Sequence, residues 1–112
     1  PVTSTLALKM RPLTLPPAAE RDENAVQMLS AWIAERGLHC TLNIGMWSDA
    51  GVKEPEAWGK LLADVARHIG NALHAHSGLE ASSCVEAVMK AFLTELGAPT
   101  SQARGEFRDR HH

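Results

Sequence analysis

The sequence predicts a small α+β domain built as helix, strand, long helix and helix. Three patterns in a chain of 112 residues lead to this prediction. Residues 55–77 and residues 85–96 repeat large apolar side chains at helical spacing, whereas residues 38–47 alternate apolar and polar side chains as a strand does. The chain is long enough for one hydrophobic core and too short for two.

The chain divides into three predicted parts. Residues 1–19 should form an extended or flexible arm, because Pro12, Pro16 and Pro17 cannot donate to a sheet. Within this arm, Met10 precedes a plausible domain start, so residues 1–9 resemble an optional leader. Residues 20–97 form the globular domain. Residues 98–112 lack an apolar period and are expected to be a flexible tail.

The first helix is expected to begin near Asp22, whose carboxylate can accept from the free amides of a first turn. Apolar residues then follow helical spacing, and Gly37 stands where a helix commonly ends in a left-handed residue. The core face of this helix would contain Ala25, Val26, Leu29, Trp32, Ile33 and Arg36.

The strand is expected to place Leu38, Cys40, Leu42, Ile44 and Met46 on one face. A lone strand cannot satisfy its own backbone donors and acceptors, so it must pair with something. Three partners are open: the N-terminal arm, a strand that the pattern does not reveal, or the same strand of a second copy. The last of these would make the protein a homodimer.

The central helix is expected over residues 55–77, with Pro55 in its first turn. It is apolar around more than half of its circumference, so we expect it to be buried at the centre of the fold or of a dimer. A row of small residues lets another backbone approach closely, either within the chain or from a second chain. Since a glycine inside a helix costs roughly 1 kcal/mol relative to alanine, close packing should offset that cost. The interface candidates are Gly59, Ala63, Ala66 and Gly70.

The last helix is expected to begin at a capping box formed by Ser83 and Glu86 and to end at Gly97. Its apolar stripe keeps helical spacing throughout. The stripe contains Val85, Val88, Met89, Phe92, Leu93 and Leu96.

Charge and hydropathy exclude several classes of protein. The net charge is −2, and no basic stripe with interleaved aromatic residues is present, which argues against nucleic acid as a partner. No run of about 18 apolar residues predicts a membrane span. The N-terminus lacks the apolar region of a secretory signal, so a cytoplasmic location is expected.

A ligand site between the strand end and the central helix is a second functional hypothesis. Two tryptophans and a carboxylate flank that loop and would suit a small ligand with an apolar body, although packing alone, or an interface anchored by Trp47, also explains them. Asp64 and His68 are one helical turn apart, so the carboxylate can orient the imidazole for chemistry or merely anchor a half-buried histidine. The candidate ligand-binding residues are Trp47, Asp49, Trp58, Asp64 and His68.

The sequence predicts no catalytic residue, no metal site and no cofactor. His74 and His76 are two residues apart on a helix and point in different directions. Cys40 and Cys84 lack the close spacing of metal-binding cysteine pairs, and we expect both to be reduced.

Several short motifs carry a resemblance to a known family. They are Trp32-Ile33-Ala34, Gly37-Leu38-His39, Leu42-Asn43-Ile44-Gly45, Trp47, Trp58-Gly59, Leu62-Ala63-Asp64 and Arg67-His68. On these motifs the chain resembles a family of small, mainly alphaproteobacterial proteins, the domain of unknown function DUF5076. The resemblance extends roughly from Leu13 to Leu96 and implies a stand-alone, cytoplasmic domain. It supplies no catalytic residue, substrate or cofactor.

The sequence therefore favours a non-enzymatic interaction module that self-associates as a homodimer and has the capacity to bind a further protein partner. The alternative is a small-molecule-binding domain or minor enzyme with its site between the strand end and the central helix.

Overall fold

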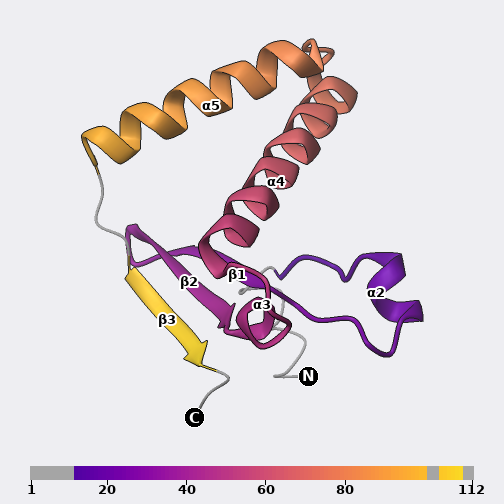
Figure 1. Cartoon of the computed structure of the whole chain (residues 1–112). Helices are drawn as coiled ribbons and strands as arrows, with labels where there is room; N and C mark the ends of the chain where they lie inside the picture. The colour runs from indigo at the N-terminus through magenta and orange to yellow at the C-terminus, as the bar shows by residue number, and fades with distance from the viewer. Residues whose placement is uncertain (1–11, 101–103, 110–112) are drawn as a thin grey trace.

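The computed structural model describes residues 12–100 and the backbone of residues 104–109, and its fold is α+β, as predicted (Figure 1). The predictions for residues 1–11 lie outside this part of the chain. The described elements, in chain order, are α2 (Pro17–Arg21), β1 (Leu29–Ala34), β2 (Gly37–Ile44), α3 (Met46–Asp49), α4 (Glu54–Ser77), α5 (Ala81–Gly97) and β3 (Arg104–Asp109).

Within the described residues, the sheet has three strands in the order β1-β2-β3. β1 and β2 form an antiparallel hairpin in which Leu29 lies opposite Leu42 and Ile33 opposite Leu38. β3 pairs in parallel with the other edge of β2. The predicted strand is thus confirmed as β2, but it ends at Ile44 and not at Trp47, because Gly45 turns the chain into α3. Its main partner is a strand that the apolar pattern did not reveal.

The helix predicted to begin near Asp22 is wrong, because its second half is β1. The Asp22 carboxylate accepts from the Asn24 N–H at 2.9 Å, but this contact closes a turn rather than starting a helix. Pairing with β2 gives residues 29–34 a full set of hydrogen bonds along one edge, and this tertiary pairing overrides the local helical spacing. Of the residues predicted as one helical face, Leu29 and Ile33 lie on one face of β1 and Trp32 on the other. Ala25 and Val26 precede the strand, and Arg36 lies in the turn after it.

Residues 98–112 were expected to form a flexible tail, yet residues 104–109 form β3. Their pairing with β2 depends on a strand far away in the sequence, which a search for local periodicity does not detect. In the described part of the N-terminal arm, residues 12–19, no strand joins the sheet, and α2 begins at Pro17.

The two long helices agree with their predicted positions. α4 ends at Gly78, which has a left-handed backbone (φ 72°) and donates its N–H to the His74 carbonyl at 2.9 Å. α5 ends at Gly97 as predicted, but the predicted capping box is wrong because the helix begins earlier, after Glu80. The Glu80 carboxylate accepts from the hydroxyls of Ser82 and Ser83.

α4 and α5 contact each other near the turn that joins them and then diverge as the two arms of a V (Figure 1). Near that turn a Cβ added to Gly70 would lie 2.9 Å from both the Ala81 carbonyl oxygen and the Val85 Cγ2. Cys84, which is 8% exposed, lies in the same stretch. This end of the V is therefore closely packed within one chain.

One chain does not bury the central helix, so of its two predicted settings the centre of the fold is not the one observed, and the centre of a dimer stays a prediction. Among the described residues the buried hydrophobic side chains are only those of Ala57 and Cys84. On α4 the large side chains of Leu62, Val65 and Ile69 are 40%, 38% and 39% exposed. A single copy thus leaves much of its apolar surface uncovered.

Candidate functional site

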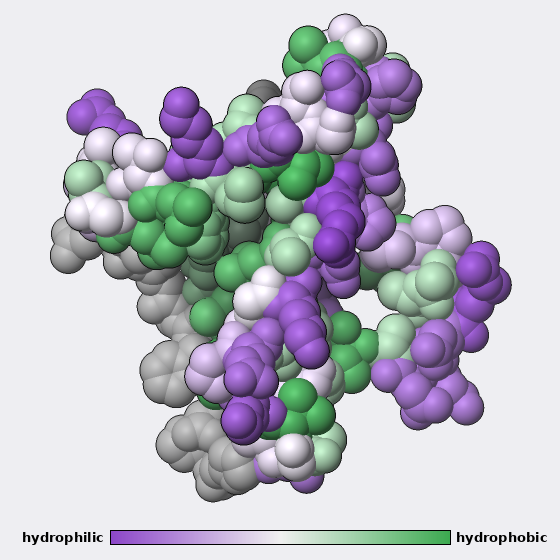
Figure 2. Space-filling model, turned by 45° about the horizontal axis from the view of Figure 1, so that its top comes forward, coloured by the Kyte–Doolittle hydropathy of each residue, from purple (hydrophilic) through white to green (hydrophobic). Residues whose placement is uncertain are grey.

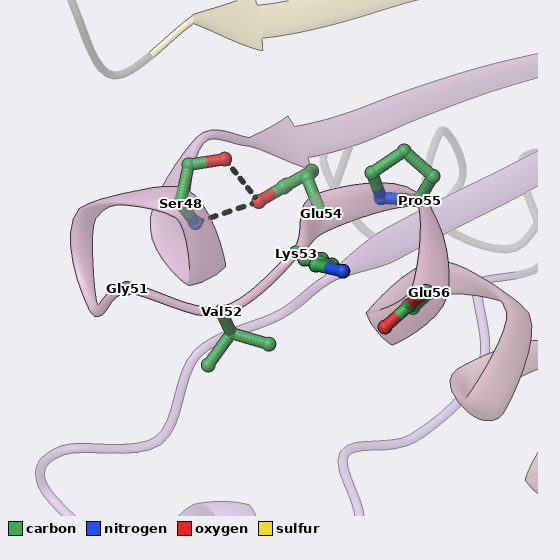
Figure 3. Close-up of a pocket in the computed structure, with 7 residues that line it drawn as sticks. All are labelled: Ser48, Gly51, Val52, Lys53, Glu54, Pro55 and Glu56. Carbon is green, nitrogen blue, oxygen red and sulfur yellow. Dashed lines mark hydrogen bonds between the residues drawn. The ribbon is translucent and has the colours of Figure 1, made fainter.

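Glu54 joins the start of α4 to the short helix α3. Its Oε1 accepts from the Gly45 N–H at 3.0 Å and from the Trp58 Nε1–H at 3.1 Å. Its Oε2 accepts from the Ser48 N–H at 2.8 Å and from the Ser48 hydroxyl at 3.0 Å, and Figure 3 shows both contacts with Ser48. One carboxylate therefore satisfies two backbone amides at the start of α3 and fixes α3 against α4.

The backbone conformation of Gly45 allows the two backbone amides to reach the Glu54 carboxylate. Gly45 is buried and has a left-handed conformation (φ 100°), which glycine adopts without the steric cost of a Cβ. The conformation turns the chain from β2 directly into α3, so that the Gly45 and Ser48 amides both reach the same carboxylate.

These hydrogen bonds lower the pKa of Glu54 from its usual value of 4.5. The largest cause is the bond from the Gly45 N–H, and the bonds from Ser48 and Trp58 act in the same direction, while desolvation opposes them. The charged form is favoured because every partner donates to it. We therefore assign Glu54 a structural role as an ionised hydrogen-bond acceptor.

Trp47 and Trp58 lie together, as their positions around the loop suggested. Their ring centroids are 5.3 Å apart and the rings are nearly perpendicular, at 88°. This is an edge-to-face aromatic pair, whose positive ring edge meets a negative ring face. Since Trp58 also donates to Glu54, the pair and the carboxylate form one cluster at the strand end.

Two of the other candidate ligand residues, Asp64 and His68, do not join this cluster in a common site. Asp64 and His68 follow Trp58 on α4 by about 9 and 15 Å along the helix axis, and both are exposed. The Asp64 carboxylate accepts from Arg67 Nη1 at 2.8 Å, so the predicted pairing of Asp64 with His68 is wrong. Asp49 is exposed at the end of α3.

A shallow depression does lie at the expected place, between the end of β2 and the start of α4 (Figure 3). Residues of α3, of the loop after it and of the first turn of α4 line the depression, and neither Trp47 nor Trp58 does. The Glu54 carboxylate there is already hydrogen-bonded to Ser48. The depression is lined by Ser48, Gly51, Val52, Lys53, Glu54, Pro55 and Glu56.

The row of small residues on α4 is divided between two environments. Gly70 packs against α5 within the chain, and Ala66 is half-buried. A Cβ on Gly59 would meet nothing within 4 Å, and Ala63 is exposed. The row predicted as one interface therefore serves internal packing at one end, while the other end is uncovered.

Exposed apolar side chains on α4 and α5 form a surface that we call the open helical face. Exposure along α5 rises with distance from the turn, from 8% at Cys84 to 47% at Phe92 and 67% at Leu96. Figure 2 shows hydrophobic residues gathered along the side of α5 that turns toward α4. The open helical face consists of Leu62, Val65 and Ile69 on α4 and of Met89, Phe92, Leu93 and Leu96 on α5.

In the described part of the chain, no three side chains of His, Cys, Asp or Glu are grouped so that they could hold a metal ion. No helix there has the length and apolarity needed to cross a bilayer. Cys40 and Cys84 are free thiols, as expected.

Glu54 was not among the residues singled out from the sequence. Its position four residues before Trp58, in the first turn of a helix, was a usable signal for a contact with that indole. No comparable sequence signal indicated the hydrogen bonds from Gly45 and Ser48, because these depend on the left-handed backbone of Gly45.

A Glu54→Gln variant should be less stable at neutral pH, because an amide oxygen and an NH₂ group cannot both accept from the four donors. The pKa of Glu54 is lower in the fold than in the unfolded chain. Its stabilising effect is therefore complete above the unfolded value and lost as the pH falls through the folded one. Denaturant unfolding followed by tryptophan fluorescence should show a wild-type advantage at pH 7 that shrinks in acid.

Glu56→Gln is the matched control, since Glu56 is an exposed glutamate on the same turn of α4. Equal unfolding midpoints for the two variants at pH 7 would contradict the role given to Glu54.

Comparison with known proteins gives a family and a solved structure. The model of a family described as "Domain of unknown function (DUF5076)" matches residues 12–100. A solved structure described as "Structure of a putative pyruvate dehydrogenase from the photosynthetic bacterium Rhodopseudomonas palustrus CGA009" is 30% identical, with a TM-score of 0.59. The match covers 88% of this chain and 92% of that one. No curated protein matches the chain.

Proposed function

The chain belongs to the DUF5076 family of domains of unknown function, and from this premise we propose that it is a non-enzymatic module that self-associates as a homodimer. The observation that carries the proposal is the open helical face. Seven large apolar side chains on two helices are each exposed by more than a third in a single copy, and apolar patches of this kind commonly mark protein interfaces.

The composition of the open helical face supports a second copy as the occupant. The buried cores of homodimer interfaces are more apolar than the rest of a protein surface. Apolar faces without charged residues at their centre are also typical of such interfaces.

The alternative is a small-molecule site or minor enzyme at the strand end, lined by some of Trp47, Asp49, Trp58, Asp64 and His68. The description of the similar structure as a pyruvate dehydrogenase and the depression beside α3 favour it. Against it, the Glu54 carboxylate already accepts four hydrogen bonds from the protein, which leaves it little capacity for a ligand. A cytoplasmic location and a further protein partner stay predictions from the sequence.

Light scattering coupled to size-exclusion chromatography tests the proposal. We expect a mass about twice the 12.1 kDa of one chain, persisting on dilution as an obligate dimer should. A folded species with the mass of one chain at all concentrations would refute self-association. If that monomer were also stabilised against heat by pyruvate, the alternative function would take its place.

A further inference from the structure

β1 has one edge to which no strand is paired in the part of the chain that the structure describes. The Asn43 N–H donates to the Met28 carbonyl at 3.0 Å, so the backbone of Met28 is turned toward β2. Backbone groups alternate in direction along a strand, so those of Leu29, Ala31 and Ile33 are turned toward the open edge. β1 also contains no charged residue and no proline, the residues that commonly prevent an open edge from pairing. The edge can therefore accept a further strand.

The chain's own segment 12–16 lies across a groove from this edge. The groove has a volume of about 680 Å³, and the four consecutive residues 29–32 line it together with residues 12–16. On the segment, Leu13 is 96% exposed and Leu15 is 63% exposed. The segment is thus close to the open edge, but its two large apolar side chains are not covered there.

The prolines of segment 12–16 fit an edge strand in one orientation. Pro12 and Pro16 have no N–H. Along an extended chain, the backbone groups of Leu13 and Leu15 point to the opposite side from those of the prolines. When the two leucines are turned toward β1, both prolines face solvent, as prolines in edge strands do. Pro16 has an extended backbone (φ −60°, ψ 142°), and a residue that precedes a proline favours extended geometry too.

We infer that segment 12–16 is a strap that closes on β1 as an additional antiparallel strand. The chain leaves the strap, turns through α2 and returns directly to β1, a connection that favours an antiparallel pair. Closure satisfies the open edge within one chain, so this inference does not depend on the proposed self-association.

The register of the closed strap follows from the groove. Pairing the residues that line its two sides places Leu13 opposite Ala31 and Leu15 opposite Leu29. Opposite residues of an antiparallel pair point to the same face, so these four side chains share the sheet face of Ile33. Leu13 becomes a diagonal neighbour of Ile33, which is 88% exposed while the strap is open. Closure therefore covers apolar side chains as well as backbone groups.

Amide hydrogen exchange, followed by NMR on the full chain, tests the closure. In the wild type the Ala31 amide should be protected, because it donates to the strap. Leu13→Pro removes the opposite donor and should speed this exchange by about tenfold, the effect of losing one hydrogen bond. Thr14→Pro is the matched control, because the Thr14 N–H faces solvent in this register. The Trp32 amide, which is turned toward β2, should stay protected in all three proteins and shows that the hairpin is folded.

Rapid exchange at Ala31 in the wild type, beside a protected Trp32, would overturn the closure. Equal acceleration in both proline variants would overturn the orientation of the strap. Protection that Leu13→Pro leaves unchanged, or that is lost on dilution, would assign the edge to another strand and also overturn the closure. A monomeric wild type would refute self-association and leave the strap in place, because the strap forms within one chain.

A disulfide between the strap and β1 tests the register. Leu13→Cys/Ala31→Cys places the two Cα atoms about 5.5 Å apart, within the span that a disulfide bridges. This variant and its control also carry Cys40→Ala, because Cys40 lies opposite Ala31 in the hairpin. In the control, Leu13→Cys/Ala34→Cys, the two cysteines are separated by about 10 Å along the strands. After mild oxidation of dilute protein, thiol labelling should detect only Cys84 in most of the first variant and every cysteine in the control. Equal bridging in both variants would overturn the register.

Discussion

Replacing Gly70 with alanine is expected to destabilise the fold by about 1–3 kcal/mol, the usual cost of an extra methyl group in a packed contact. The new Cβ would lie 2.9 Å from the Ala81 carbonyl oxygen and 2.9 Å from the Val85 Cγ2. Because one neighbour is backbone, the contact can be relieved only by moving α5 away from α4. Chemical denaturation of the purified variant measures the effect.

Gly59→Ala is the matched change on the same helix, and we expect it to stabilise the fold rather than destabilise it. A Cβ at Gly59 meets nothing within 4 Å, and alanine is favoured over glycine inside a helix by up to about 1 kcal/mol. The free energy of unfolding should therefore rise in Gly59→Ala and fall in Gly70→Ala. If both variants were stabilised, the close contact between α4 and α5 would be wrong.

Charges placed on the open helical face should abolish the dimer. The double variant Phe92→Glu/Leu96→Glu changes two exposed residues of α5 that make few contacts within one chain, so the monomer should stay helical. Burying an unpaired carboxylate costs several kcal/mol. We therefore expect the dimer Kd to rise by at least about a hundredfold. Sedimentation or light scattering over a dilution series measures this change.

Lys90→Glu is the control for charge alone, because Lys90 is an exposed, hydrophilic position on the same helix. This variant should keep the wild-type mass. A double variant that remained dimeric with wild-type affinity would show that the open helical face is not the interface.

The elements that the sequence predicted well are those whose pattern is local. α4 and α5 carry long apolar stripes at helical spacing, and β2 alternates over eight residues. β1 was missed because Leu29, Trp32 and Ile33 fit a helix and a strand equally. Its hairpin also turns through Glu35 and Arg36, with φ of 50° and 64°, where a hairpin of this kind usually shows asparagine and glycine.

The candidate site was predictable only in part, for a similar reason. Trp47 and Trp58 flank a short loop and therefore meet. The pairing of Asp64 with His68 failed because Arg67, one position closer on the same helix surface, carries a permanent charge and takes the carboxylate. The Glu54 contacts depend on the backbone conformation of Gly45, which a residue pattern does not specify.

The sequence also did not predict that the open helical face would be exposed in a single chain. An amphipathic stripe indicates that side chains will be covered, but it does not say whether the same chain or another one covers them. The clean stripe on α5 is present as predicted, and most of it lacks a covering element in one copy.

The parallel pairing of β3 with β2 has a consequence for how the chain folds. The two strands are separated in sequence by α3, α4 and α5, so bringing them together closes a long loop and carries its entropic penalty. The β1–β2 hairpin and the turn between α4 and α5 need only short-range contacts. We therefore expect those two units to nucleate first, with the C-terminal strand joining in a late kinetic step.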